Sequence, residues 1–242
     1  MFRHLLFLPI MLLIFACGQN QQVQQQTNTD GAAQVVLSDP KDNLNIQINS
    51  FSEIDSSGIL MFPLSMEESE RPGSSSLYKD VPENSHWNII FLDTRTNEQH
   101  LLSDRKMLIR GLNYSIRSAD DDAGTNKYIF YTVTVDDYNA DKKLTDEDPE
   151  YLFVSDRAGN GFRQISPANY DLHNWQFIKS ANKVFMTVKK DSDKNSKFDE
   201  KDEVATFEVD MNKETAPKEV FSMEFKTQLK VLYDRDWKRL KK

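Results

Sequence analysis

The chain has 242 residues, of which 38% are hydrophobic and 11% aromatic, so it can build a core and is not disordered throughout. Its 38 acidic and 30 basic side chains give a formal net charge of −8, which argues against nucleic-acid binding because that function needs a basic face. A single Cys excludes a disulfide framework and a zinc site built from cysteines.

The N-terminus has the layout of an exported lipoprotein. The apolar run from Leu5 to Phe15 is shorter than the roughly 20 residues that cross a bilayer, but it suits a signal-peptide core. It ends in Ile14-Phe15-Ala16-Cys17, which resembles a bacterial lipobox, where the Cys takes the lipid. We therefore expect a signal peptide over residues 1–16 and lipidation at Cys17. The alternative is an ordinary secretory signal followed by a chance Cys.

A Gln-rich segment follows and cannot bury enough apolar surface to order itself. Residues 17–35 are therefore predicted to be the lipidated Cys and a flexible tether, and residues 36–242 the folded domain. Gly18, rather than Asp, follows the Cys, which favours the outer over the inner membrane in a two-membrane cell. The expected location is the bacterial cell envelope, with the chain held to a membrane by its lipid.

Apolar residues in the folded part recur with period two, as at Leu44-Ile46-Ile48, Trp175-Phe177 and Phe225 to Tyr233. No window holds a sustained apolar stripe of helical period. The sequence therefore predicts an all-β fold, with a spare strand near Phe225 to Tyr233 and a frayed, basic C-terminal end after it.

The predicted strands repeat in a fixed order. Residues 128–133 and 183–188 are alike, and each is followed by an acidic loop, a strand ending in Asp156 or Asp210, and a short fourth strand. The loops and third strands are offset by 54 residues. A more divergent copy precedes them. These observations predict three four-stranded antiparallel meander repeats, with first strands at 44–49, 109–117 and 172–180, second strands at 59–62, 128–133 and 183–188, third strands at 89–93, 151–156 and 205–210, and fourth strands at 100–103, 162–166 and 218–222.

The strand ending in Asp156, the turn after it and Arg163-Gln164-Ile165-Ser166-Pro167 resemble the TolB-like β-propeller blades of bacterial envelope proteins. The resemblance covers roughly residues 43–222 and implies a β-propeller-like arrangement. Closed propellers usually have four or more blades, so an open arc or a sandwich of the same meanders are the alternatives.

Two acidic loops, 137–148 and 191–202, have the ligand spacing of an EF-hand calcium loop. Oxygen-bearing residues stand at positions 1, 3, 5, 9 and 12, and position 7 offers its backbone carbonyl, because calcium takes six to eight oxygen ligands. Both loops resemble dockerin-type loops, in which Asp can stand at position 12. The predicted ligands are Asp137, Asn139, Asp141, Lys143, Thr145 and Asp148 in the first loop, and Asp191, Asp193, Asn195, Lys197, Asp199 and Asp202 in the second.

Both loops depart from the usual pattern at position 6, where Lys142 or Ser196 replaces the Gly of the sharp turn. A left-handed backbone there costs a non-glycine residue about 1 kcal/mol. Asp at position 12 is also shorter than Glu. We therefore expect two weak, structural calcium sites, with solvated acidic hairpin loops as the alternative. The second loop has more anionic ligands and should fill first.

Other motifs predict no chemistry. The Asp120-Asp121-Asp122 run is interpreted as a solvated turn, and His86, His100 and His173 lack the spacing of a zinc site. No nucleophile elbow or phosphate-binding loop is present. The sequence therefore predicts a non-catalytic binding or scaffolding module for an envelope protein or glycan. The alternative is an envelope enzyme or sensor with a loop-built site bordered by calcium. An intracellular calcium buffer conflicts with the signal segment.

Overall fold

The computed structural model describes residues 26–27, 33–34, 48, 50–65, 85–113, 127–213 and 215–238. The predicted signal peptide, Cys17 and the turn at 120–122 lie outside these ranges. Within the predicted tether, β1 (Gln26–Thr27) pairs antiparallel with β2 (Ala33–Gln34). The other described residues belong to a compact unit that begins at Ile46.

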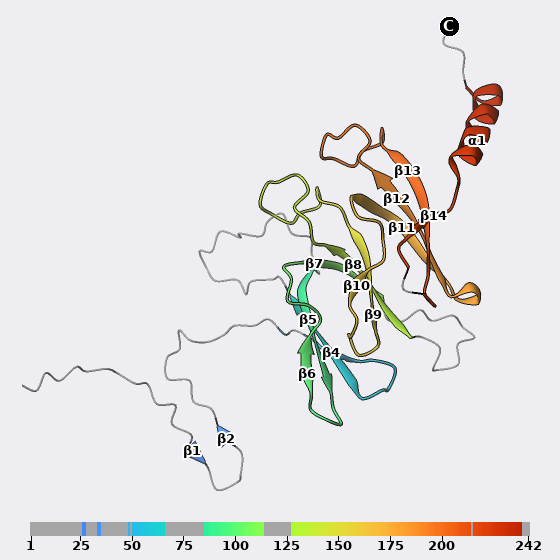
Figure 1. Ribbon diagram of the computed structural model, residues 1–242. Coiled ribbons are helices and arrows are strands. Elements are labelled where there is room, and N and C mark those ends of the chain that lie inside the picture. The colour runs from blue at the N-terminus through green and yellow to red at the C-terminus, as the bar shows by residue number, and fades with distance from the viewer. Residues whose placement is uncertain are drawn as a thin grey trace, which may run out of the picture. The chain divides into compact units, whose positions relative to one another are not determined.

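The first part of this unit is an antiparallel sheet in which strands follow the order β10-β9-β8-β7-β5-β4-β3, with β6 also paired to β5 (Figure 1). Alternating burial marks β4, where Ile59 and Met61 lie in the core, whereas β9 is buried on both faces. The strands are β3 (Ser52–Glu53), β4 (Ile59–Ser65), β5 (His86–Asp93), β6 (Gln99–Leu101), β7 (Leu108–Asn113), β8 (Tyr128–Thr134), β9 (Tyr151–Asp156) and β10 (Arg163–Gln164).

The second sheet is a meander in chain order, β11-β12-β13-β14. Its strands are β11 (Tyr170–Ile178), β12 (Lys183–Lys190), β13 (Glu203–Asp210) and β14 (Lys218–Glu219). A 3-10 turn (Lys179–Ala181) joins the first two, and Asn182 closes it in a left-handed conformation. The register of β11 shifts between Leu172 and Asn174.

The prediction of a mainly β fold is confirmed, since the sheets are antiparallel and neither closes on itself. Most predicted strands lie where the sequence placed them. The pairing of His86 in β5 with Ile109 in β7 joins the eight strands β3 to β10 into one sheet, so the strand pairing does not delimit three separate units. The predicted first strand at 44–49 lies outside the described residues except for Ile48, which forms an isolated antiparallel bridge with Leu64.

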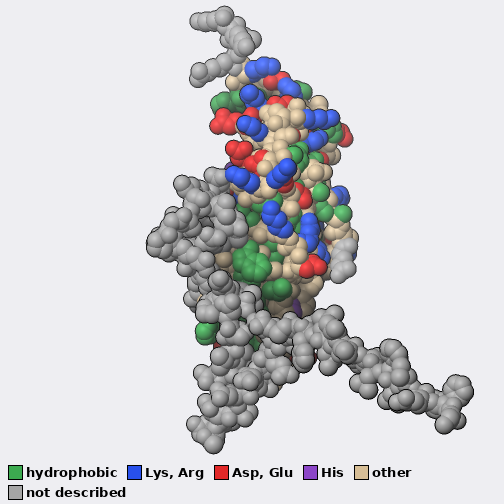
Figure 2. Space-filling view, turned by 90° about the vertical axis from the view of Figure 1, so that its left-hand side faces the viewer, with side chains coloured by type: hydrophobic (Ala, Val, Ile, Leu, Met, Phe, Trp, Pro, Cys, Tyr) green, Lys and Arg blue, Asp and Glu red, His purple; other side chains and the backbone are tan. Residues whose placement is uncertain are grey.

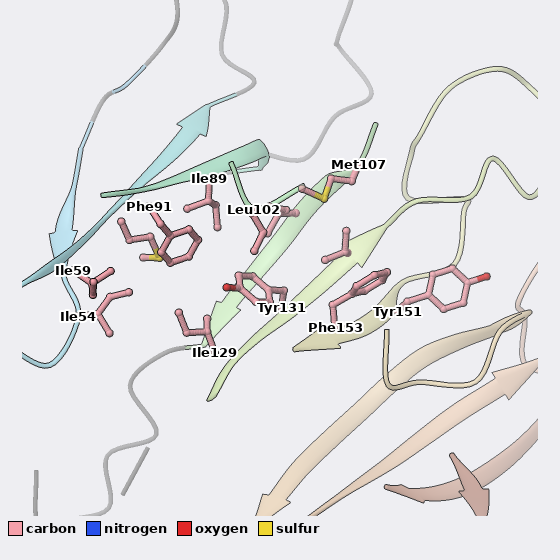
Figure 3. Close-up of a cluster of buried hydrophobic side chains, with 13 residues drawn as sticks. Ile54, Ile59, Ile89, Phe91, Leu102, Met107, Ile129, Tyr131, Tyr151 and Phe153 are labelled. Carbon is pink, nitrogen blue, oxygen red and sulfur yellow. The ribbon is translucent and has the colours of Figure 1, made fainter. Parts of the chain in front are cut away.

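Two cores hold the strands. Figure 3 shows the first, in which side chains from β4, β5, β8 and β9 point toward one another, with Phe91 and Tyr131 near its middle. The second core joins the two sheets, because Phe130 and Val154 of the first sheet pack with Val184 and Met186 of the second. Phe130 also contacts the ring of Trp175, with centroids 4.9 Å apart. The second sheet therefore packs on strands β8 and β9.

Three strands end in an Asp that organises the turn after it. Asp93 ends β5, Asp156 ends β9 and Asp210 ends β13. The Oδ1 of each accepts the backbone N–H two residues further on, at 2.8 Å, 2.8 Å and 3.0 Å. These side chains offer the chain a local turn in place of another ladder bond, which explains why each strand stops there.

The prediction of a strand at Phe225 to Tyr233 is wrong, because residues Met223–Asp236 form an α-helix, α1. The Ser222 hydroxyl accepts the N–H of Phe225 at 3.2 Å, Glu224 stands in the first turn, and Arg235 stands in the last. Phe225, Leu229 and Leu232 also follow a helical period, which the alternation of apolar residues masked. In the part of the chain that the structure describes, no helix has the length and apolar character needed to span a membrane.

Candidate metal centre

The two predicted calcium loops occupy equivalent places in the fold. The first joins β8 to β9 and the second joins β12 to β13, so each connects the second and third strands of a meander. Figure 1 shows both loops at the same end of their strands. The structure therefore brings together two segments that the sequence placed 54 residues apart.

The Asp at position 1 of each loop accepts hydrogen bonds from the backbone of the same loop. In the first loop, the Oδ1 of Asp137 accepts the N–H of residue 141 at 2.9 Å, and its Oδ2 accepts that of residue 142 at 2.7 Å. In the second, the Oδ1 and Oδ2 of Asp191 accept the N–H groups of residues 195 and 196, each at 3.0 Å. The same side chain therefore folds both loops in the same way.

Position 12 ties the end of each loop to its beginning. The carboxylate of Asp148 accepts the N–H of position 2 at 2.8 Å and that of position 9 at 2.9 Å. Asp202 accepts the same two N–H groups of its own loop at 2.7 Å and 2.9 Å. Both carboxylates are buried, and these backbone donors lower the pKa of Asp202. Asp202 therefore favours the ionised form that a cation site needs.

The middle positions also match. The Oδ1 atoms of Asn139 and Asp193, at position 3, accept the N–H of position 5. The Oδ1 atoms of Asp141 and Asn195, at position 5, in turn accept the N–H of position 7 at 2.8 Å. At position 9, Thr145 and Asp199 accept the N–H two residues on. Position 7 itself is Lys143 or Lys197.

The backbone makes the sharp turn that the sequence predicted at position 6, where φ is 72° at Lys142 and 61° at Ser196. Position 4 is also left-handed in both loops, with φ of 62° at Ala140 and 60° at Lys194. This second turn was not predicted, because neither Ala nor Lys favours positive φ. Each loop thus carries backbone strain at two non-glycine positions, which its side-chain hydrogen bonds must offset.

Carboxylates converge in the second loop. One oxygen from each of Asp191, Asp193 and Asp202 lies within 4.8 Å of the other two. Oxygens this close on three ionised groups repel one another, and a cation among them would relieve the repulsion. In the first loop, position 3 is the amide Asn139, which removes one of the three charges. The second loop is therefore better suited to bind a cation than the first.

The two loops touch through Tyr138, at position 2 of the first. Its hydroxyl donates to the Oδ2 of Asp191 at 3.2 Å, and its ring packs on Phe198, with centroids 5.1 Å apart. Burial, and then the Asp191 carboxylate, raise the pKa of Tyr138. Sequence reasoning missed this residue, since position 2 is not a ligand. Phe198, at position 8 of the second loop, supplies the other ring of this contact.

Basic side chains brace both loops. Arg110 of β7 forms ion pairs with Asp146, at position 10 of the first loop, and with Glu150 just beyond that loop. Lys189, near the end of β12, donates to the backbone carbonyl of Phe198 at 3.2 Å. The Lys189 ammonium also helps to lower the pKa of Asp202. A cation in the second loop would therefore have a positive neighbour, which reduces its affinity.

A hollow of about 300 Å³ lies away from the loops, and its lining includes Tyr128, Asp156, Arg163 and Lys213. The Tyr128 hydroxyl donates to the carbonyl of Met211 at 3.1 Å, so it serves to join the sheets. If the protein were an enzyme, which is the alternative interpretation of the sequence, this hollow would be the place to test for a catalytic site.

Comparison of the sequence with protein-family models found no match. A search of curated proteins likewise gave no relative.

Proposed function

We propose that this protein is a membrane-anchored, calcium-binding, non-catalytic β-repeat lipoprotein of the bacterial cell envelope. In this proposal, the lipid is attached at Cys17, each acidic loop holds one structural calcium ion, and the domain serves as a binding or scaffolding module. The observation that carries the calcium proposal is the shared geometry of the two loops, in which the carboxylates at positions 1 and 12 accept the same backbone donors.

A repeated unit is part of the proposal. Asp156 and Asp210 end strands that pair with β8 and β12, opposite Tyr128 and Lys183. Asp93 ends β5 opposite Ile59 of β4 in the same way. Three meanders of four strands, two of them carrying a calcium loop between strands two and three, agree with these registers. The proposal places the first two meanders in one continuous sheet.

The expected role of calcium is to stiffen the domain. Folding brings the three carboxylates of the second loop together, so the native state carries a repulsion that the unfolded chain lacks. An ion that binds only the native loops stabilises the fold by RT ln(1 + [L]/Kd). With a Kd of about 1 mM, as for extracellular calcium modules, 10 mM calcium adds about 1.4 kcal/mol per site.

The test is thermal unfolding of the purified protein with calcium and with magnesium at equal ionic strength. Two occupied sites should raise the melting temperature by roughly 5–10 °C in 10 mM calcium. Magnesium should do less, because it prefers a rigid octahedron and keeps its water. A melting temperature that calcium does not move, with no heat of binding in calorimetry, would contradict the proposal.

Variants assign the effect to each loop. Asp191→Asn and Asp137→Asn each remove one anionic ligand while keeping an oxygen acceptor for the loop backbone. Each should remove one binding transition, with the tighter one lost in Asp191→Asn. Asp104→Asn is a matched control, because Asp104 is an exposed acidic residue outside both loops. Calcium stabilisation should be unchanged in that control.

The anchor is tested separately. Cys17→Ser should release the protein from membranes and abolish fatty-acid labelling. A Cys17→Ser protein that still fractionates with membranes and labels normally would contradict lipidation, whatever the outcome of the calcium titration.

A further inference from the structure

Helix α1 carries an exposed apolar stripe. Phe225, Leu229 and Leu232 fall on one side at the helical period, with Phe221 and Tyr233 continuing it at either end. Their exposed fractions lie between 42% and 61%, and the helix contains no buried residue. These side chains are as apolar as those in the two cores, and none of them is covered in the described part of the chain.

Ion pairs hold the first turn of α1 against the second sheet, whereas the apolar stripe stays exposed. Lys226 forms ion pairs with Glu203 of β13, at 3.0 Å, and with Glu219 of β14. Lys226 lies on a different side of the helix from Leu232, so this clamp leaves the stripe open. The helix therefore has a defined starting point and a free apolar surface.

The charge around the stripe differs from that of the remaining chain. Residues 223–242 hold seven Lys or Arg against three Asp or Glu, whereas residues 1–222 hold 23 against 35. Figure 2 shows Lys and Arg side chains exposed together with Asp, Glu and hydrophobic side chains in the upper part of the surface, where Figure 1 places α1. Within α1 three Lys or Arg balance three Asp or Glu, so the basic excess lies at Lys238 and the residues after it. An apolar stripe followed by a Trp and a basic end is a pattern of helices that lie in a membrane interface.

We propose that α1 binds an anionic lipid surface, with Phe225, Leu229 and Leu232 toward the acyl chains and the basic C-terminal end that follows the helix at the headgroups. Charge favours this occupant over a second copy of the chain, because two such basic segments repel each other whereas anionic lipids attract them. The interaction goes beyond the proposed calcium and anchoring functions and does not depend on either.

The predicted anchor would strengthen the binding. About 30 residues separate the predicted lipid at Cys17 from the bridge at Ile48, so the anchor would hold the domain within a short distance of the bilayer. The helix would then stay close to the bilayer, and even a weak affinity would hold it there. Lipid and helix would act as two separate contacts, which together fix the orientation of the domain.

The test is hydrogen exchange of the purified full-length chain, as cells process it, with vesicles of phosphatidylcholine alone or mixed with phosphatidylglycerol. Amides of α1 should exchange at least tenfold more slowly with the anionic vesicles than with the neutral ones, and 0.5 M salt should remove most of the difference. Mass spectrometry of the same preparation reports lipidation, so failure of the anchor and failure of the helix are distinguished.

Leu229→Asp with Leu232→Asp should abolish the protection, and Thr227→Asp, on the opposite side of the helix, should keep at least half of it. All three positions are exposed, so the sheets should fold unchanged. Equal exchange with both vesicle types would overturn the proposal, as would protection that survives in the double variant. Protection that rises with protein concentration in the absence of vesicles would assign the stripe to a second copy instead.

Discussion

The contact between the two acidic loops should contribute measurably to stability. Tyr138→Phe removes the hydroxyl that donates to Asp191 but keeps the ring against Phe198. A hydrogen bond to a charged group contributes about 1.5–3 kcal/mol, and the 3.2 Å length and partial exposure place this one near 1 kcal/mol. Tyr138→Leu also removes the aromatic pair, which is worth roughly a further 1 kcal/mol.

Thermal unfolding in calcium-free buffer measures both effects. For a domain of this size, about 1 kcal/mol corresponds to 2–4 °C, so Tyr138→Phe should melt 2–4 °C lower and Tyr138→Leu about twice as far below the unmodified protein. Tyr233→Phe, on the exposed face of α1, is the control and should melt unchanged. If Tyr138→Phe melts with the control while Tyr138→Leu does not, the hydroxyl contact contributes nothing and the loops are held together by packing alone.

Three further predictions follow from local geometry. Lys142→Gly should raise the melting temperature by about 1–2 °C, because glycine adopts its φ of 72° without strain, whereas Lys143→Gly, outside the left-handed region, should lower it. Asp93 should titrate with a pKa of about 2, since its hydrogen bond from Arg95 stabilises the ionised carboxylate. Because folding depresses this pKa, the stability it contributes is present above the ordinary value near 4 and is lost as the pH falls toward 2; NMR titration of Arg95→Ala should show the pKa rising part of the way to its ordinary range, since the backbone N–H of residue 95 still donates to the carboxylate. Gly159→Ala should lower the melting temperature by several degrees, because its φ is 82° and a Cβ would lie 2.4 Å from an aromatic ring of β5.

The strands were largely predictable because each depends on its own pattern. Residues 128–134 and 183–190 alternate or run apolar between clear breakers, and both form strands with bounds close to those expected. The pairing of β5 with β7 involves a single residue pair, and no sequence pattern in either strand predicts it. Helix α1 was missed because Phe225 to Tyr233 satisfies period two and the helical period together, and the capping signal at Ser222 decides between them.

The loops were predictable for a related reason, since their ligand spacing is local. Spacing predicted which residues line each loop and the left-handed turn at Lys142 and Ser196. It could not predict which carboxylates converge, because that depends on the path of the backbone in three dimensions. Nor could it predict the contact of Tyr138 with Asp191, which joins residues 53 apart and exists only because the two meanders pack side by side.

The pairing order bears on how the chain acquires its structure. With the exception of β5 and β7, which are separated by the short β6, each long strand pairs with the strand next to it in sequence within the described residues. Each newly made strand therefore pairs with a strand that precedes it closely in the chain, so its contacts are of low sequence separation even where the connecting loop is long, as between β8 and β9. The protein can fold progressively from its N-terminal side while the remainder is still being synthesised. The strands that would otherwise expose open edges are covered in the order in which they appear, which limits aggregation during synthesis.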